Sequence, residues 1–125
     1  MKKLTKEQIL MLHAELIKET GGTDGLRDEG LLDSALNAPF QEFGETAAYP
    51  SLQQKAARLG FGFIQNHAFV DGNKRIGMYV MLTFLEVNGI HMDCTNEDVV
   101  EAGLGVASGE MDYEDLLAWV RTHCT

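Results

Sequence analysis

The sequence predicts a compact all-α domain, a single-domain helical bundle of about six helices around a central apolar helix. Apolar residues recur at helical spacing in several segments, and most of these segments begin at Ser, Thr, Asp or Asn and end at Gly, Asn or Pro. Strand patterns are scarce, and no repeat, low-complexity segment or linker divides the chain. The length of 125 residues suits one core, so we expect one domain over residues 1–125.

The first part of the chain predicts two helices followed by a loop. A capping box that begins at Thr5 precedes an amphipathic pattern, which indicates a helix over residues 5–19 that a pair of glycines stops. A shorter apolar helix over residues 31–36 is ended by Pro39. Residues 39–50 contain aromatic side chains without a clear period, which indicates a loop or short hairpin suited to gripping a partner.

Four more helices are expected, each with a polar residue at its start. The first of them should run to about Asn66, which we expect to act as its C-cap. The second is apolar on most of its faces, and this makes it the expected central helix. The four helices are predicted to begin at Ser51, at Asn73, at Thr95 or Asn96, and at Asp112.

Composition and charge exclude several classes of protein. No apolar run approaches the roughly 20 residues that a membrane span needs, and the start of the chain leads into a charged amphipathic segment instead of a signal peptide. We therefore expect a cytoplasmic protein in which Cys94 and Cys124 are reduced and structural. The formal net charge of −9 argues against a nucleic-acid-binding surface and suits a basic protein partner.

One polar stretch, residues 67–75 with the sequence HAFVDGNKR, carries the functional argument. It leads into the start of the central helix, where unpaired backbone N–H groups and the helix dipole favour an anion. Gly72 lets a phosphate approach the backbone closely, and Asn73 offers an amide. Lys74 and Arg75 supply two cations. Together these residues predict a phosphate-binding site.

Two further residues of the stretch suggest a reaction. Asp71 would repel phosphate groups unless a hard cation such as Mg²⁺ lay between them, so its presence implies a metal. His67 stands at the other end of the stretch, and an imidazole can accept the proton of a hydroxyl that attacks phosphorus. A base, a metal carboxylate and a phosphate site together describe transfer from a nucleotide to a protein hydroxyl.

Each of these residues also has a purely structural explanation. A histidine at a helix end is more often a cap than a base, an Asp-Gly-Asn run is a common turn, and a Lys-Arg pair is often a solvated helix face. Phe69 is assigned to the core on these grounds. The functional explanation is favoured because so many polar residue types coincide within one short stretch.

The stretch resembles the Fic motif, His-x-Phe-x-Asp/Glu-Gly/Ala-Asn followed by a basic helix start, and the all-α prediction agrees with the Fic fold. Residues 25–36, Tyr49-Pro50, residues 55–57 and Asn88-Gly89 are similar to the small Doc (death-on-curing) branch of that family. The resemblance covers most of the chain and implies a role for each motif residue. His67 would be the general base, Asp71 would bind Mg²⁺, Gly72 and Asn73 would form the anion hole, and Lys74 and Arg75 would hold the phosphates of ATP.

Two positions separate two reactions within the family that the chain resembles. Adenylylating Fic enzymes carry Gly after the motif Asn and a second Arg three residues after the first, whereas this chain has Lys74 and Met78 there. Both departures match Doc, and the resemblance then implies a toxin that transfers the terminal phosphate of ATP to elongation factor Tu or a similar translation factor. The alternatives are adenylyl transfer (AMPylation) and a non-catalytic helical module that binds a peptide near residues 39–50.

The resemblance to Doc also implies a partner, an antitoxin whose C-terminal segment folds into a groove on the toxin. We find no built-in inhibitory Ser/Thr-x-x-x-Glu run, so a separate inhibitor is expected, and the acidic charge suits a tail rich in Lys and Arg. Target specificity would lie in residues 39–50. The roles of His13 and Arg27 stay open, with Arg27 either binding an antitoxin carboxylate or capping the following helix.

Overall fold

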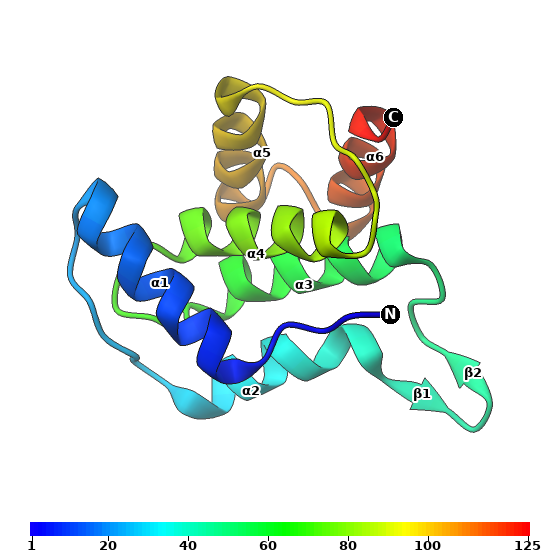
Figure 1. Cartoon of the computed structure of the whole chain (residues 1–125), viewed down its shortest axis with the longest axis horizontal. Helices are drawn as coiled ribbons and strands as arrows, with labels where there is room; N and C mark the ends of the chain where they lie inside the picture. The colour runs from blue at the N-terminus through cyan, green and yellow to red at the C-terminus, as the bar shows by residue number, and fades with distance from the viewer.

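Six α-helices account for most of the chain in a computed structural model that describes residues 1–125 (Figure 1). A 3₁₀ turn, η1, and a small antiparallel hairpin of strands β1 and β2 separate the second helix from the third. The all-α prediction is therefore confirmed. The elements are α1 Lys6–Thr20, α2 Glu29–Asn37, η1 Ala38–Phe40, β1 Glu42–Phe43, β2 Thr46–Ala47, α3 Leu52–Asn66, α4 Asn73–Val87, α5 Asn96–Ser108 and α6 Tyr113–His123.

Four of the predicted helix starts are confirmed by side-chain caps, and α4 begins at Asn73 as expected without such a cap. Thr5 and Ser51 close the two capping boxes expected from the sequence, with Gln8 and Gln54 as their partners. Thr95 caps α5 and Asp112 caps α6 in the same way. The one difference is α2, which begins before residue 31 because the side chain of Asp28 accepts a hydrogen bond from the backbone N–H of Leu31.

Helices α3 and α4 lie side by side through the middle of the molecule, with α1 and α2 on one side and α5 and α6 on the other (Figure 1). One apolar core of 21 buried residues joins all six helices. The prediction of a central apolar helix is confirmed, and α3 shares this position with α4. The buried residues of α4 are Ile76, Gly77, Met78, Val80, Met81, Phe84 and Leu85.

Two glycines bring α3 and α4 into unusually close contact. A Cβ atom added at Gly77 would lie 2.6 Å from Ile64 Cγ1 and 3.0 Å from the carbonyl oxygen of Gly60. A Cβ at Gly60 would in turn lie 3.3 Å from the carbonyl oxygen of Gly77. The two helix backbones therefore touch at this crossing, within two turns of the helix ends that flank residues 67–72.

Replacing Gly77 with Ala is expected to destabilise the protein. The added Cβ meets backbone as well as a buried side chain, and overpacking of this kind costs about 1–3 kcal/mol, more than the roughly 1 kcal/mol that Ala gains in helix propensity. Gly62→Ala is the matched control, because its Cβ would lie 3.5 Å from Ala35, an ordinary contact. We expect urea denaturation to show a lower midpoint for Gly77→Ala and an equal or higher midpoint for Gly62→Ala. The reverse order would contradict the close crossing.

Residues 39–50 form the expected hairpin, at the end of α3 that lies far from His67. Phe43 is 72% exposed in β1, while Tyr49 packs edge-on against Tyr113 with ring centroids 5.4 Å apart. The hairpin leads into the first residue of α3, and the length of that 15-residue helix places it roughly 20 Å from His67 at the other end. The groove described below and a smaller cavity are lined by residues outside 39–50, and a peptide-binding role of the hairpin stays a prediction.

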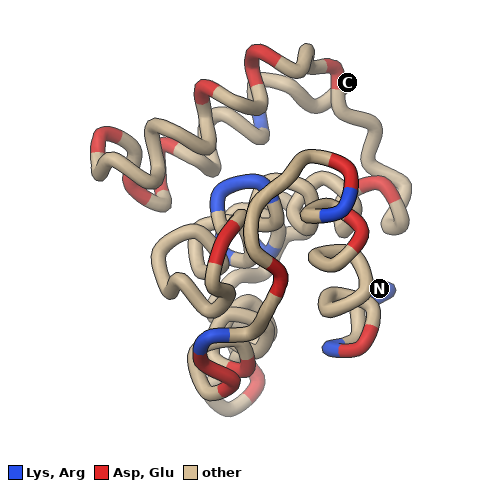
Figure 2. The backbone as a smooth tube through the Cα atoms, turned by 90° about the vertical axis from the view of Figure 1, so that its left-hand side faces the viewer, with Lys and Arg blue, Asp and Glu red and all other residues tan.

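Two sequence expectations concern the molecule as a whole. No helix combines the length and apolar character needed to cross a membrane. Cys94 and Cys124 are free thiols, as expected. Figure 2 shows Asp and Glu spread along many parts of the chain and fewer Lys and Arg, which fits the net charge of −9.

Candidate functional site

Residues 67–72 connect α3 to α4, and the loop that follows α1 holds them in place. Leu26 and Phe69 form an isolated antiparallel bridge. The Arg27 N–H donates to the carbonyl of Ala68 at 2.8 Å, and the Val70 N–H donates to the carbonyl of Gly25 at 3.0 Å. The two loops therefore form one unit at the left-hand end of Figure 1.

His67 has an unusual backbone conformation and an exposed side chain. It is the one non-glycine residue with positive φ, at φ 51° and ψ 49°, and it takes the C-cap position of α3. Asn66 is the last helical residue, so its predicted role as the C-cap is wrong. The His67 imidazole makes no hydrogen bond or ion pair with the chain and is open to solvent. Left-handed backbone at a non-glycine residue is strained and is concentrated at functional sites.

Arg27 supports this conformation. Its Nε donates to the carbonyl of His67 at 2.7 Å, and its Nη2 donates to the carbonyl of Asn66 at 3.2 Å. Carbonyls at a helix C-terminus lack intrahelical partners, so the guanidinium satisfies them and stabilises the end of α3. Arg27 thus caps the C-terminus of α3 and does not cap α2, the helix that follows it in the chain, while its binding of an antitoxin carboxylate stays a prediction.

Asn73 closes the loop on itself. Its Oδ1 accepts a hydrogen bond from the Phe69 N–H, and its Nδ2 donates to the Phe69 carbonyl, both at 3.0 Å. The Phe69 ring is 1% exposed, so the prediction that it anchors the loop in the core is confirmed. The Asn73 amide shapes the loop, and the backbone N–H groups of the first helical turn remain for an anion.

Those N–H groups are free. Gly72, at φ 78°, is the N-cap of α4 and offers no side-chain cap. The backbone N–H groups of Asn73, Lys74 and Arg75 have no acceptor within the chain. At the start of a 15-residue helix they form the kind of anion site that the sequence predicts.

The Asp71 carboxylate is held in the ionised form. Its Oδ1 accepts from the Gly72 N–H at 2.8 Å and its Oδ2 from the Thr23 N–H at 3.2 Å, and Arg75 Nη2 lies 3.8 Å from Oδ1. The hydrogen bonds from Thr23 and Gly72, and then the charge of Arg75, lower the pKa of Asp71 below its usual value. About half of the side chain is exposed, so a ligand can reach the carboxylate.

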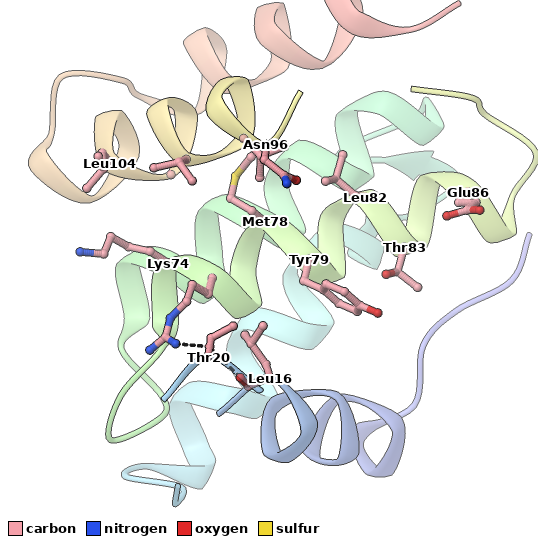
Figure 3. A pocket seen from close by; sticks show the side chains of 14 residues that line it. Leu16, Thr20, Lys74, Met78, Tyr79, Leu82, Thr83, Glu86, Asn96 and Leu104 are labelled. Atoms are coloured by element: carbon pink, nitrogen blue, oxygen red, sulfur yellow. Dashed lines mark hydrogen bonds between the residues drawn. The ribbon is translucent and has the colours of Figure 1, made fainter. Parts of the chain in front are cut away.

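Arg75 and Lys74 differ in how they are held. Arg75 Nη1 donates to the Thr20 hydroxyl and, at 2.9 Å, to the carbonyl of Gly21, so the end of α1 fixes its guanidinium near Asp71. Lys74 makes no hydrogen bond or ion pair and extends away from the helix (Figure 3). One cation is therefore preorganised and the other is free to move toward a ligand.

A groove of about 500 Å³ begins at these two cations and runs along α4 between α1 and α5 (Figure 3). We call it the α1–α4–α5 groove. Lys74 lies at one end and Glu86 at the other, and exposed apolar side chains line the length between them. Its lining residues are Leu16, Thr20, Lys74, Arg75, Met78, Tyr79, Leu82, Thr83, Glu86, Asn96, Val99, Val100, Gly103 and Leu104.

His13 also belongs to this unit, although the sequence left its role open. It is 1% exposed on the buried face of α1, and its Nε2 lies 2.7 Å from the carbonyl oxygen of Asp71. Its spacing with Ile9 and Ile17, four residues on either side, could have shown that the ring is buried. Nothing local could have shown what it contacts, because Asp71 lies 58 residues away.

The sequence is similar to a known protein family and to two known proteins. A model of the Fic/DOC family matches residues 3–85, which contain α1 and nearly all of α4. The chain is 44% identical over 72 residues to Toxin Doc of Mycolicibacterium smegmatis, covering 58% of this chain and 55% of that protein. It is 24% identical over 121 residues to Protein kinase doc of Escherichia phage P1, covering 97% of this chain and 94% of that protein. The match thus spans about half of the first relative and nearly all of the second.

Proposed function

Because the chain belongs to the Fic/DOC family, we propose that it is the toxin of a toxin–antitoxin pair and transfers the terminal phosphate of ATP to a hydroxyl of a translation factor. One observation carries the proposal. The exposed imidazole of His67, the ionised carboxylate of Asp71 and the unpaired N–H groups at the start of α4 all lie on one short loop that two other segments hold rigid. Preorganised groups of this kind are what phosphoryl transfer requires.

In this proposal His67 is the general base. Its ring nitrogen takes the proton of the acceptor hydroxyl while the hydroxyl oxygen bonds to the terminal phosphorus of ATP. The bond from that phosphorus to the bridging oxygen breaks, and ADP leaves. The left-handed backbone and the Arg27 hydrogen bonds fix the direction in which the imidazole leaves α3. Its freedom from other contacts leaves it available for the acceptor.

The phosphates of ATP would bind at the start of α4. The free N–H groups of Asn73, Lys74 and Arg75 face the negative charge there, and the Arg75 guanidinium keeps donors beyond those used by Thr20 and Gly21. Lys74 can swing onto a phosphate oxygen because nothing else holds it.

Asp71 would hold Mg²⁺. No group of three or more His, Cys, Asp or Glu side chains surrounds a possible metal position, so phosphates and water would supply most of the ligands beside the Asp71 carboxylate. This donor set suits Mg²⁺, which keeps several waters and is commonly bound through one or two carboxylates and substrate phosphates. When bound, the ion would neutralise the phosphate charge that the ionised Asp71 otherwise repels.

Two observations favour transfer of the terminal phosphate over adenylyl transfer. Lys74 follows the motif Asn, and the apolar Met78, 2% exposed, occupies the position at which adenylylating Fic enzymes carry a second Arg. The similarity to Protein kinase doc along nearly the whole chain points in the same direction. A cation for the outer phosphates of an adenylyl donor is thus absent at that position.

We place the antitoxin segment in the α1–α4–α5 groove. Val100 and Leu104 are 59% and 52% exposed there, on successive turns of α5, and would be covered by an apolar face of the segment. A segment rich in Lys and Arg would suit the net charge of −9. Because Lys74 and Arg75 form one end of the groove, an occupant would also restrict access of ATP.

The proposed reaction is tested with ATP that carries its label on either the α or the terminal phosphate. The purified chain is incubated with MgCl₂ and a translation extract, and labelled protein is identified after electrophoresis. We expect label to pass to a translation factor from the terminal phosphate only. Label passing only from the α-phosphate would replace the proposal with adenylyl transfer. Toxicity in cells without transfer of either label would support a non-catalytic binding module.

A further inference from the structure

We propose that His13 is a positioning residue on α1 that sets the geometry of residues 67–72 by direct contact. The proposal concerns the same site as the phosphotransfer proposed above, and its catalytic part rests on that function. His13 lies on α1, outside residues 67–75, and the proposed mechanism does not use it. It is nevertheless one of two buried polar or charged side chains in the chain, at 1% exposed.

The His13 ring contacts the loop in two ways. Its face stacks on Phe69, with ring centroids 3.7 Å apart and planes inclined by 11°. Its edge places Nε2 2.7 Å from the carbonyl oxygen of Asp71. A carbonyl oxygen can only accept a hydrogen bond, so Nε2 carries a proton and donates it. The other ring nitrogen, Nδ1, lies 3.5 Å from the exposed carboxylate of Asp24.

Because the peptide bond is planar, the hydrogen bond from His13 to the Asp71 carbonyl also fixes the direction of the Gly72 N–H. In the trans peptide between Asp71 and Gly72, the C=O and N–H bonds point in opposite directions. By drawing the carbonyl toward α1, His13 turns the Gly72 N–H away from α1, and that N–H donates to Asp71 Oδ1 at 2.8 Å. The same rotation sets the left-handed backbone of Gly72 at the start of α4. His13 thus orients both the carboxylate and the helix N-terminus.

There is little room for another arrangement. A Cβ atom at Gly72 would lie 3.0 Å from Ile17 Cδ1 and 3.6 Å from His13 Nε2, so α1 packs directly against the turn. Without a donor at position 13, the Asp71 carbonyl would face a buried apolar surface unpaired, and the peptide would rotate to find another partner. Arg75 would keep its place, because Thr20 and Gly21 hold it independently.

Two substitutions separate the two contacts. His13→Phe keeps an aromatic ring against Phe69 and removes the donor, whereas His13→Gln keeps an N–H at nearly the position of Nε2 and removes the stacking. Met11→Ala is the control, since this α1 side chain is 69% exposed and lies outside the site. For each variant, kcat and KM for ATP are measured by transfer of labelled terminal phosphate. Hydrogen exchange of the Gly72 amide is measured by NMR, and thermal unfolding gives the folded fraction.

We expect His13→Phe to fold and to lower kcat roughly 100-fold, the effect of a small misplacement of catalytic groups, with a smaller change in KM for ATP because Arg75 stays in place. Exchange of the Gly72 amide should accelerate in the same variant. His13→Gln should recover most of the loss in kcat and restore the slow exchange, and Met11→Ala should match the wild type.

The proposal is overturned if His13→Phe keeps the wild-type kcat and Gly72 exchange, or if both variants lose activity only in proportion to their folded fraction. Failure of the proposed function is a separate result. If the wild type transfers no phosphate, the Gly72 exchange rate still decides whether His13 positions the loop, because that measurement needs no substrate.

Discussion

His67→Ala is expected to abolish phosphate transfer and toxicity while the fold remains intact. The imidazole is exposed and makes no hydrogen bond or ion pair within the chain, so its removal leaves no unpaired buried group. Loss of a general base typically lowers a rate by about 10²–10⁴-fold. The rate is measured with ATP labelled on its terminal phosphate, and circular dichroism during heating reports the fold.

Because His67 has a left-handed backbone conformation, a second variant is needed to separate loss of the base from a change in the backbone. Alanine is less suited than histidine to a left-handed conformation, so His67→Ala could move the end of α3 as well as remove the base. Asn is one of the residues that tolerate this conformation best, and His67→Asn therefore removes the base while keeping the backbone. We expect both variants to be equally inactive. His91→Ala, which changes an exposed histidine outside the site, should keep full activity. Transfer at the wild-type rate by His67→Asn would exclude His67 as the base.

Much of the fold could be predicted because its signals are local. The capping boxes at Thr5 and Ser51 join residues three apart, and each one marks a helix start that the structure contains. Residues 67–75 could also be interpreted from the sequence, because the polar groups of this stretch are neighbours in the chain. The helix N-terminus at Asn73 and the buried anchor Phe69 both follow from the sequence of this stretch.

What could not be predicted depends on contacts between distant residues. Arg27 supports His67 across 40 residues, and Thr23 holds the Asp71 carboxylate across 48. Neither pairing has a periodic or motif signal, because both arise only when the loop after α1 lies along residues 67–70. The groove was expected near residues 39–50 on the strength of their aromatic side chains. The structure contains in addition a groove along α4, lined by residues of α1, α4 and α5 that lie far apart in the sequence, and no local pattern indicates it.

The contacts of Asp71 change the argument for its role. The sequence suggested that a carboxylate beside phosphates requires a metal, but two backbone N–H groups and Arg75 already stabilise its charge. A test must therefore separate metal binding from loop structure. Asp71→Asn serves this purpose, since the amide oxygen can still accept a hydrogen bond from the loop while the charge is lost.

We expect Asp71→Asn to lower phosphate transfer by roughly 100-fold or more, because the stabilisation of transition-state charge by a bound ion amounts to several kcal/mol. The initial rate is measured as a function of MgCl₂ concentration, and the variant should need more Mg²⁺ to reach its own maximum. Asp93→Asn, a change at another exposed carboxylate, is the control and should leave the Mg²⁺ requirement unchanged. An unaltered rate and Mg²⁺ requirement in Asp71→Asn would exclude this carboxylate as the metal ligand.

Asp71→Asn is also expected to change the pH dependence of protein stability, and this effect does not require a metal. Because hydrogen bonds from Thr23 and Gly72 lower the pKa of Asp71 in the folded protein, the ionised carboxylate stabilises the fold above its unfolded pKa of about 3.9. That contribution is lost as the pH falls through the lower pKa of the folded state. In urea denaturation without Mg²⁺, the wild type should be more stable than Asp71→Asn at pH 7, and the difference should shrink below about pH 3.9. A difference in stability that stays constant down to pH 3 would show that the Thr23 and Gly72 hydrogen bonds do not favour the charged carboxylate.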